Sequence, residues 1–287
     1  MIDLIQMRLD GYQVTGPIEE ENALKEIVQE VVLFALWRAD FFGVAAFQGG
    51  TSLRILHGLN RFSEDIDFIL QQPNPGFQWQ PYLDNITNTC EEFGLVPEVL
   101  DKQHMDRNVK AALIKDNSIA NQLNLRFYNS QPGRKLTIKL EIDTNPPAGS
   151  GFEYQYLDFP VDYEVCHQDL SSNFALKIHA LLCRPYVKGR DWYDFNWYVA
   201  RGITPNLVLL KNALMQYGPW QGQNLTVDHV WLIKAMGEKI AEMNWQEAAA
   251  DVERFLRPIE QSSLKLWSKR FYMSKLGQLD TLLTTVK

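Results

Sequence analysis

Cysteine is scarce in this sequence: its 287 residues include only Cys90, Cys166 and Cys183. The three are scattered and show no CxxC spacing, which argues against both a disulfide framework and a zinc site. Long apolar runs are also absent, because none reaches the roughly 18 residues that a membrane span needs. The first residues, "MIDLIQMRLDGYQV", carry acids early and lack the apolar core of a signal peptide. We therefore expect a cytoplasmic protein with no membrane partner.

Basic residues are outnumbered, with 28 Lys and Arg against 35 Asp and Glu and a formal net charge of −7. Any nucleic-acid partner must then be met by a local basic patch and not by the whole surface. One candidate is "LKLWSKRFYMSK", in which Lys265, Lys269, Arg270 and Lys275 lie among aromatic residues. This run could hold an RNA backbone, although a solvated helix face is the simpler interpretation.

The pattern of the sequence changes near residue 168. Before it, apolar residues at helical spacing predict helices over residues 16–40 and 79–97, and a short helix over residues 51–59 with Thr51 as its N-cap. Strands are expected over residues 44–50, 65–73, 119–130 and 134–147, with a turn around Pro132 and Gly133, and residues 159–168 are expected to form a last strand or an extended crossover. After it, all segments with a periodic pattern predict helices, the first over residues 170–185 with Ser171 or Ser172 as its cap. The predicted class is α+β, a mixed sheet followed by an all-helical part.

The stretch "FQGGTSLRILHGLNRFSEDIDFIL" places two carboxylates one residue apart at the start of an apolar strand. Residues i and i+2 of a strand point to the same face, so Asp65 and Asp67 project together. Two carboxylates this close repel each other unless a cation lies between them, and Mg²⁺ held by carboxylates and substrate phosphates fills that role. Upstream, Gly49 and Gly50 let the backbone approach a ligand, and amides at the start of the next helix can face phosphate.

A second acidic pattern lies in "RKLTIKLEIDTNPP", where Glu141 and Asp143 share one strand face. Placed beside the first strand, they would supply a third carboxylate. Three acids with one or two metal ions suit in-line displacement at a phosphoryl group. A lone D-x-D is usually a solvated strand end. Its combination with Gly-Gly and a short helix is less common, so we interpret the two segments as a metal site.

These segments resemble the sequence signatures of a known family. Gly49-Gly50-Thr51 followed by "RFSEDID" resembles the signature of the AbiEii/AbiGii toxin family, a branch of the polymerase-beta-like nucleotidyltransferase superfamily. "KLEIDTNPP" resembles its third-carboxylate strand, and "ALKIHALLCRPYVKGRDWYDFNWYV" its second signature, a Lys followed by Arg-Asp-x-x-Asp. Fourteen residues separate Gly50 from Asp65, a longer gap than in minimal superfamily members and one that this branch shares.

The resemblance implies a nucleotidyltransferase domain over residues 1–168, with an N-terminal helix and a mixed sheet flanked by helices. It implies a helical domain over residues 169–287 that contributes Lys177 and the 190–194 segment to the site. The reaction would transfer a nucleoside monophosphate from an NTP to an acceptor and release pyrophosphate. Several relatives are toxins paired with a cognate antitoxin, some of which extend the 3′ end of tRNA, and phage defence is the expected setting.

The resemblance also implies individual roles. Asp65 and Asp67 would ligate Mg²⁺, with Mn²⁺ as an alternative ion. Glu141 or Asp143 would be the third carboxylate and would receive the proton of the attacking hydroxyl, directly or through water. Lys177 would contact triphosphate oxygens as a point charge. The remaining catalytic or nucleotide-binding residues would be Gly49, Gly50, Thr51, Arg61, Ser63, Arg190, Asp191 and Asp194.

Structural alternatives exist for several of these residues. Arg61 either touches phosphate or supports the Asp pair through a salt bridge, and we favour the second. Ser63 either bonds the nucleotide or caps a turn. Lys177 is otherwise a surface residue of an amphipathic helix, Asp191 a helix N-cap, and Asp194 a local partner of Arg190.

Three hypotheses for function follow. The leading one is a Mg²⁺-dependent nucleotidyltransferase toxin that acts on RNA, with tRNA as the first candidate. The second keeps this chemistry but changes the acceptor to a small molecule or a protein hydroxyl, which the acidic net charge favours slightly. The third is an inactive nucleotide-binding or partner-binding module, against which the intact carboxylates argue.

Overall fold

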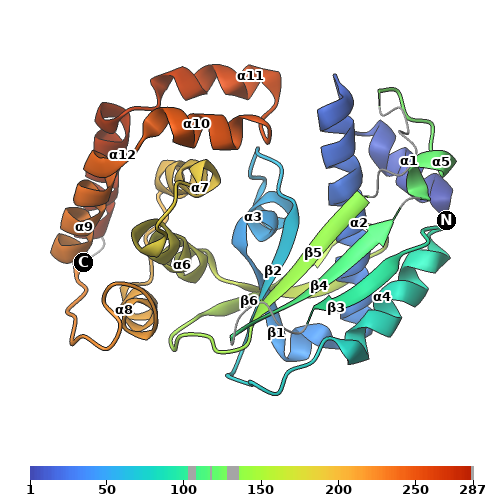
Figure 1. The fold of residues 1–287 in the computed structure, drawn as a ribbon, viewed down its shortest axis with the longest axis horizontal. Helices are drawn as coiled ribbons and strands as arrows, with labels where there is room; N and C mark the ends of the chain where they lie inside the picture. Colours follow the sequence, from blue (N-terminus) through green and yellow to red (C-terminus); the bar gives the residue numbers. More distant parts are fainter. Residues whose placement is uncertain (103–107, 117, 128–135, 286–287) are drawn as a thin grey trace. The chain divides into compact units, whose positions relative to one another are not determined.

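The computed structural model describes residues 1–102, 108–116, 118–127 and 136–285 of the chain, apart from the side chains of residues 120 and 121. The chain divides into two compact units (Figure 1). Unit 1 comprises Met1–Pro146 and Phe152–His167, and unit 2 comprises Pro147–Gly151 and Gln168–Lys287. Within the described residues, no helix is long and apolar enough to cross a membrane.

Unit 1 is built on a seven-stranded mixed sheet with the strand order β3-β4-β5-β2-β1-β7-β6. The central strands β2 and β5 run parallel, whereas β1 and β4 pair with them antiparallel. The strands are β1 Ala45–Gln48, β2 Asp65–Leu70, β3 Glu98–Lys102, β4 Val109–Asp116, β5 Leu136–Asp143, β6 Phe152–Leu157 and β7 Tyr163–Gln168. The predicted α+β class with a mixed sheet and flanking helices is confirmed.

Strand β5 and the first residues of β2 bury one face of the sheet and leave the other half-buried. Alternate residues of β5, among them Ile138, Leu140 and Ile142, are fully buried, as is Ile66 of β2. Phe68 of β2 packs against Phe41 and Trp79 in an aromatic cluster. The opposite face of β2 and β5 carries the predicted acidic residues, so the period-two pattern assigned the two faces correctly.

Helices surround this sheet, and the longest of them, α2, packs against α4. Several acidic side chains of α2 are buried or half-buried because they anchor other segments. Glu30 pairs with Arg8 of α1 at 2.5 Å, and Tyr12 donates to Glu26 at 2.7 Å. The helices of unit 1 are α1 Ile2–Asp10, α2 Pro17–Arg38, the 3₁₀ helix η1 Phe41–Gly43, α3 Gly49–His57, α4 Gln80–Glu92 and α5 Ile119–Gln122.

The prediction of a strand over residues 119–130 is wrong for the part that the structure describes. Residues 119–122 form α5, because the Asp116 carboxylate accepts the amides of Ser118 and Ile119 and turns the chain. Strands β3, β4 and β6 and helix α1 were not predicted. The expected turn at Pro132 and Gly133 lies outside the described residues.

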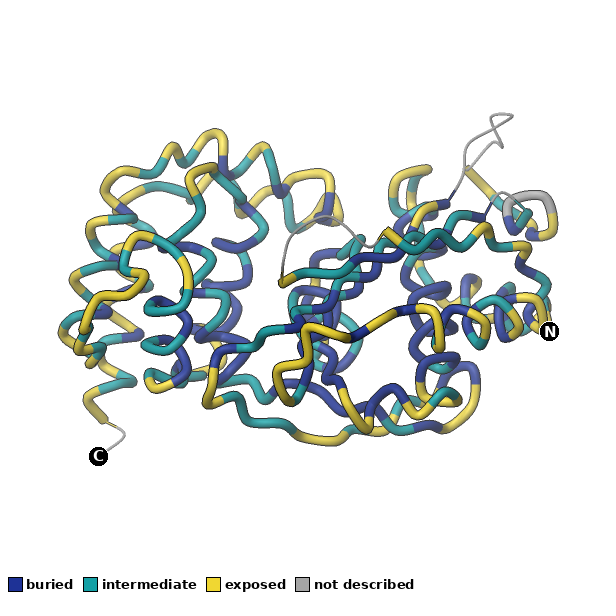
Figure 2. The backbone as a smooth tube through the Cα atoms, turned by 60° about the horizontal axis from the view of Figure 1, so that its bottom comes forward, coloured by how far each residue is buried: buried dark blue, intermediate teal, exposed yellow. Residues whose placement is uncertain are grey.

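Unit 2 contains only helices among its described elements, as predicted. In Figure 2 the outer turns of the helices that lead to the C-terminus are exposed. The N-cap of α6 is Asp169, which accepts the Ser172 amide at 2.7 Å, and not Ser171 or Ser172 as predicted. The elements are α6 Leu170–Cys183, α7 Gly189–Ala200, α8 Leu207–Gln216, α9 His229–Glu242, α10 Trp245–Glu253, α11 Pro258–Gln261, the 3₁₀ helix η2 Ser262–Leu266 and α12 Lys269–Thr285.

Candidate active site

The glycine turn of unit 1 lies against the first acidic strand. Gly49 begins α3 with a φ of +77°, a conformation that L side chains rarely adopt. A Cβ atom built on Gly49 would come within 2.6 Å of Asp67 Oδ2. Glycine is therefore required here for two reasons, the backbone conformation and the close approach of the Asp67 carboxylate.

Gly50 makes room for Arg61. The side chain of Arg61 is buried, and its Nη1 donates to the carbonyl of Phe62 at 3.0 Å. A Cβ atom on Gly50 would collide with the Arg61 guanidinium and would lie 3.2 Å from Ser63 Oγ. The structure therefore brings Arg61 and Ser63, from the loop between α3 and β2, against Gly50 of α3.

The prediction that Thr51 caps the helix is wrong. The helix begins two residues earlier, at Gly49, with Gln48 in the N-cap position. Thr51 is buried inside the first turn, and its hydroxyl donates to the backbone carbonyl of Asp65. Thr51 therefore ties the start of α3 to the start of β2.

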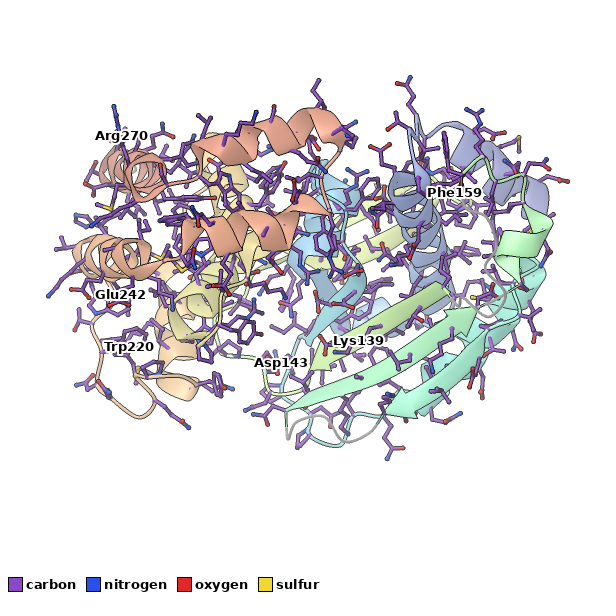
Figure 3. All side chains as sticks on the ribbon, turned by 45° about the horizontal axis from the view of Figure 1, so that its top comes forward. Lys139, Asp143, Phe159, Trp220, Glu242 and Arg270 are labelled. Atoms are coloured by element: carbon purple, nitrogen blue, oxygen red, sulfur yellow. The ribbon has the colours of Figure 1, made fainter. Side chains whose placement is uncertain are left out.

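Strands β2 and β5 place their acidic residues side by side. In their parallel register Asp67 lies opposite Glu141, Asp65 opposite Lys139, and Ile69 opposite Asp143. Partners in a parallel register share a face, so Asp65, Asp67, Lys139 and Glu141 form one group. Asp143 lies on the same strand at its end, where its Oδ1 accepts the Asn145 amide at 2.9 Å (Figure 3).

Lys139 supplies a cation within this carboxylate group. Its Nζ lies 2.5 Å from Glu141 Oε1. Burial by itself would lower the pKa of Lys139, but the hydrogen bond and charge of Glu141 and the charges of Asp65 and Asp67 raise it above the ordinary value. Lys139 was not among the predicted site residues, although its alternation with Glu141 on the strand was visible in the sequence.

The donor set of this group fits Mg²⁺ in kind, because carboxylate oxygens are the ligands that this ion prefers. In the part of the chain that the structure describes, no three His, Cys, Asp or Glu side chains converge closely enough to hold a metal ion. Lys139 explains in part why these carboxylates do not converge, because the Glu141 carboxylate is paired with the Lys139 ammonium.

The loop between α3 and β2 is held by side chains that the sequence reasoning missed. Gln29 of α2 is buried, and its amide donates to the carbonyls of Ser63 at 3.0 Å and Glu64 at 2.9 Å. Arg54 of α3 donates to the carbonyls of Leu59 and Asn60 at 3.0 and 2.8 Å. The only sequence signal was the presence of polar residues within the apolar pattern of α2.

Glu26 of α2 fixes Arg54 from the other side. Arg54 Nε donates to Glu26 Oε2 at 2.7 Å, and the Arg54 guanidinium lies 4.4 Å from the Phe62 ring centroid. Together Gln29, Glu26 and Arg54 set the path of the loop that carries Arg61 and Ser63 into Asp65.

Unit 2 gathers the second set of predicted residues. Lys177 Nζ lies 2.7 Å from Asp191 Oδ1 and 2.9 Å from Asp194 Oδ2. Arg184 also pairs with Asp191. All three predicted side chains are well buried, with exposed fractions of 11% for Lys177, 3% for Asp191 and 0% for Asp194. Lys177 is therefore not a surface lysine, and Asp191 lies inside α7 and is not its N-cap.

Arg190, the remaining predicted residue of unit 2, packs at the start of α7. Its backbone amide donates to Asp251 Oδ2 at 3.4 Å, and its guanidinium lies over the Phe255 ring at 4.4 Å from the centroid. The structure therefore joins Lys177 with Asp191 and Asp194, and places Arg190 against α10 and the turn that follows it.

Solved structures with a similar fold include a nucleotidyltransferase. MenT4, a nucleotidyltransferase toxin from Mycobacterium tuberculosis, is 16% identical; the match covers 97% of this chain and 89% of that one, with a TM-score of 0.53. JHP933 from Helicobacter pylori is 15% identical, with 93% and 91% covered and a TM-score of 0.49. At this level of identity the likeness to MenT4 shows the fold alone.

No curated protein matches this sequence. The model of one protein family does, and it is described as nucleotidyl transferase AbiEii toxin, type IV toxin–antitoxin system. The match runs from residue 31 to residue 274 and so includes the glycine turn, both acidic strands and the Lys177 group. This chain therefore belongs to the AbiEii family of nucleotidyltransferase toxins.

Proposed function

We propose that this protein transfers a nucleoside monophosphate from an NTP to a hydroxyl of RNA, with tRNA as the first candidate. The observation that carries the proposal is the register of β2 and β5, which sets Glu141 beside Asp67 on the face that also presents Asp65. Asp65, Asp67 and Glu141 would hold Mg²⁺, or Mn²⁺ in its place. When bound, such an ion neutralises the carboxylates and stabilises charge on the reacting phosphoryl group.

The residues of unit 1 have distinct parts in the reaction. The acceptor oxygen forms a bond to the α-phosphorus while the bond from that phosphorus to the bridging oxygen breaks, and pyrophosphate leaves. The proton of the acceptor hydroxyl passes to Glu141, directly or through water. The Gly49–Gly50 turn brings the amides at the start of α3 to the phosphates. The side chains of Arg61 and Ser63 pack against Gly50 and support that turn.

Lys177 has the role of a triphosphate contact in this proposal. It is held between Asp191 and Asp194, which fix the direction of its ammonium group. A positioned ammonium binds phosphate oxygens without the loss of conformational entropy that a free lysine side chain would suffer. Arg184 balances the second oxygen of Asp191, so Asp191 is fixed as well.

Labelled NTPs, Mg²⁺ and total tRNA test the proposal directly. Label on RNA is the expected result for the wild-type protein, and the Asp67→Asn variant should give none while its circular dichroism and melting temperature stay close to those of wild type. Label confined to small molecules or to protein would contradict the RNA acceptor but keep the transfer chemistry. An Asp67→Asn protein with full activity would contradict the site.

The hypothesis that this protein is toxic to the cell that expresses it has a separate test. Expression of the wild-type chain should arrest growth, and expression of the Asp67→Asn variant should not. Co-expression of a neighbouring gene that restores growth would identify the cognate antitoxin. Growth arrest that persists with Asp67→Asn would separate toxicity from the transfer reaction.

A further inference from the structure

The charge of this protein is divided unevenly along the chain. Residues 1–167 contain 13 Lys and Arg against 24 Asp and Glu, whereas residues 168–287 contain 15 against 11. The overall charge of −7 therefore hides an acidic N-terminal part and a basic C-terminal part. A basic region on an otherwise acidic protein is a local electrostatic footprint for a polyanion.

The basic charge is densest in residues 254–275, which we call the basic segment. It contains Arg254, Arg257, Lys265, Lys269, Arg270 and Lys275, and its one acidic residue is Glu260. The segment runs from the end of α10 through α11 and η2 into the first turns of α12. It lies within unit 2.

Three cations at the centre of the basic segment are exposed and not neutralised. Lys265, Lys269 and Arg270 are exposed, and in the described part of the chain none of them forms an ion pair. Figure 3 shows Arg270 at the outer surface of unit 2. By contrast, Glu260 is already paired with Arg257 at 3.2 Å. Solvated cations of this kind are available to phosphate groups.

The neighbouring exposed apolar side chains raise a second possibility, an anionic membrane surface. A helix that lies on a membrane needs a free apolar face. The apolar stripe of α12, which contains Tyr272, Leu276 and Leu279, is already buried within unit 2, where Tyr272 stacks on Trp245 at 4.1 Å. The exposed Ile259, Leu266 and Met273 lie on three different elements and form no such face. These observations favour an extended polyphosphate over a membrane.

We infer that the basic segment binds the sugar-phosphate backbone of the RNA acceptor. The inference rests on the RNA acceptor of the proposed function, but it concerns binding and not transfer. The three exposed cations Lys265, Lys269 and Arg270 lie on two successive elements, η2 and α12, and such a row matches a chain of phosphates better than a single phosphate group. Contacts to the backbone are independent of sequence, so the segment supplies affinity while the acceptor's identity is read elsewhere.

Binding of fluorescently labelled tRNA, measured by anisotropy without NTP or metal at several salt concentrations, tests the inference. The test variant carries Lys265→Gln, Lys269→Gln and Arg270→Gln. The matched control carries Lys102→Gln, Lys211→Gln and Lys234→Gln and changes the net charge equally. The test variant should bind tRNA at least about tenfold more weakly, and its slope of log K against log salt should fall by about 2 to 3.

The control variant should bind tRNA as wild type does, and both variants should bind NTP normally, which verifies that they fold. Equal affinity and salt slope for wild type and the test variant would overturn the inference and leave the transfer reaction untouched. Binding to vesicles of phosphatidylserine but not to tRNA would also overturn it. If wild type binds tRNA through the basic segment but labels no RNA, the proposed reaction fails and the binding surface stands.

Discussion

Glu141 of β5 lies directly opposite Asp67 of β2, whereas Asp143 lies two residues further along β5, opposite Ile69. Both acids share a strand face, and the sequence pattern could not choose between them as the third carboxylate. The register does distinguish them. It assigns Glu141 to the acidic group and Asp143 to the end of the strand, where it accepts the Asn145 amide.

Glu141→Gln should therefore lower the transfer rate by about 100-fold or more, because the group that receives the proton is lost. Asp143→Asn is the matched change, since the amide oxygen of Asn can still accept the Asn145 amide. It should keep most of the activity. Steady-state rates of pyrophosphate release measure both. The opposite order of effects would make Asp143 the third carboxylate.

The variants Gly49→Ala and Gly58→Ala distinguish the effect of backbone strain from the effect of a steric clash with Asp67. Both glycines have positive φ, +77° and +69°, so each substitution should cost roughly 1 kcal/mol of stability. Only at Gly49 would the new Cβ meet Asp67, while the space around Gly58 is open. Urea unfolding together with the transfer rate should show that both variants are destabilised and that Gly49→Ala alone is inactive. An active Gly49→Ala protein would contradict the geometry.

Gln29→Met keeps the volume of the side chain but removes two hydrogen bonds, to the carbonyls of Ser63 and Glu64. Leaving these carbonyls without the amide should destabilise the protein by about 1–3 kcal/mol. It should also lower kcat more than it raises KM, since the loop leads into Asp65. The control is Gln80→Met, at an exposed position on α4, which should change neither. A pure loss of stability with unchanged kcat would show that Gln29 does not position the site.

Lys177→Met should destabilise unit 2 by about 3–5 kcal/mol, because it removes the cation paired with the buried Asp194, whereas Asp191 keeps its ion pair with Arg184. The double variant Lys177→Met with Asp194→Asn removes one of these charges and should recover part of the loss. Thermal unfolding measures both variants. If the double variant is no more stable than the single one, the ion pair is not the source of the destabilisation.

Glu30 makes the stability of unit 1 depend on pH. Burial raises the pKa of Glu30 from 4.5 to about 7, against the opposing effect of Arg8. Between these two values the folded state binds more protons than the unfolded state, so stability falls as the pH rises through this window. Glu30→Gln removes the titration.

The melting temperature of Glu30→Gln relative to wild type should therefore rise between pH 5 and pH 8, by the equivalent of about 2–3 kcal/mol. The loss of the Arg8 ion pair affects the variant at both pH values, so the change of the difference with pH is the informative quantity. A difference that stays constant across this range would show that Glu30 is ionised throughout.

Much of unit 1 could be predicted because the decisive patterns are local. The alternation of apolar and polar residues predicted the apolar and acidic faces of β2 and β5. The helical spacing of apolar residues predicted α2. The register between β2 and β5 could not be predicted, because it depends on pairing across about 70 residues of chain, which no local pattern encodes.

The errors arose where one side chain decides the local structure. Asp116 turns the chain into α5, and a strand pattern over the following residues could not reveal this carboxylate's contacts. Threonine is a common N-cap residue, which is why Thr51 was predicted to cap the helix. The helix begins earlier, at Gly49, which has a left-handed backbone conformation. The support of the loop by Gln29 and Glu26 was missed because polar residues in a buried helix have no fixed sequence signature.

The close approach of Asp67 to Gly49 has a genetic consequence. Every single-base change at the first or second position of a glycine codon replaces the glycine, and at this position each replacement with a side chain meets both a strained backbone and the Asp67 carboxylate. A toxin gene that becomes a burden to its host can thus be silenced by one substitution that leaves the rest of the fold in place. Survivors of forced expression should carry changes in this codon far more often than in that of Gly58.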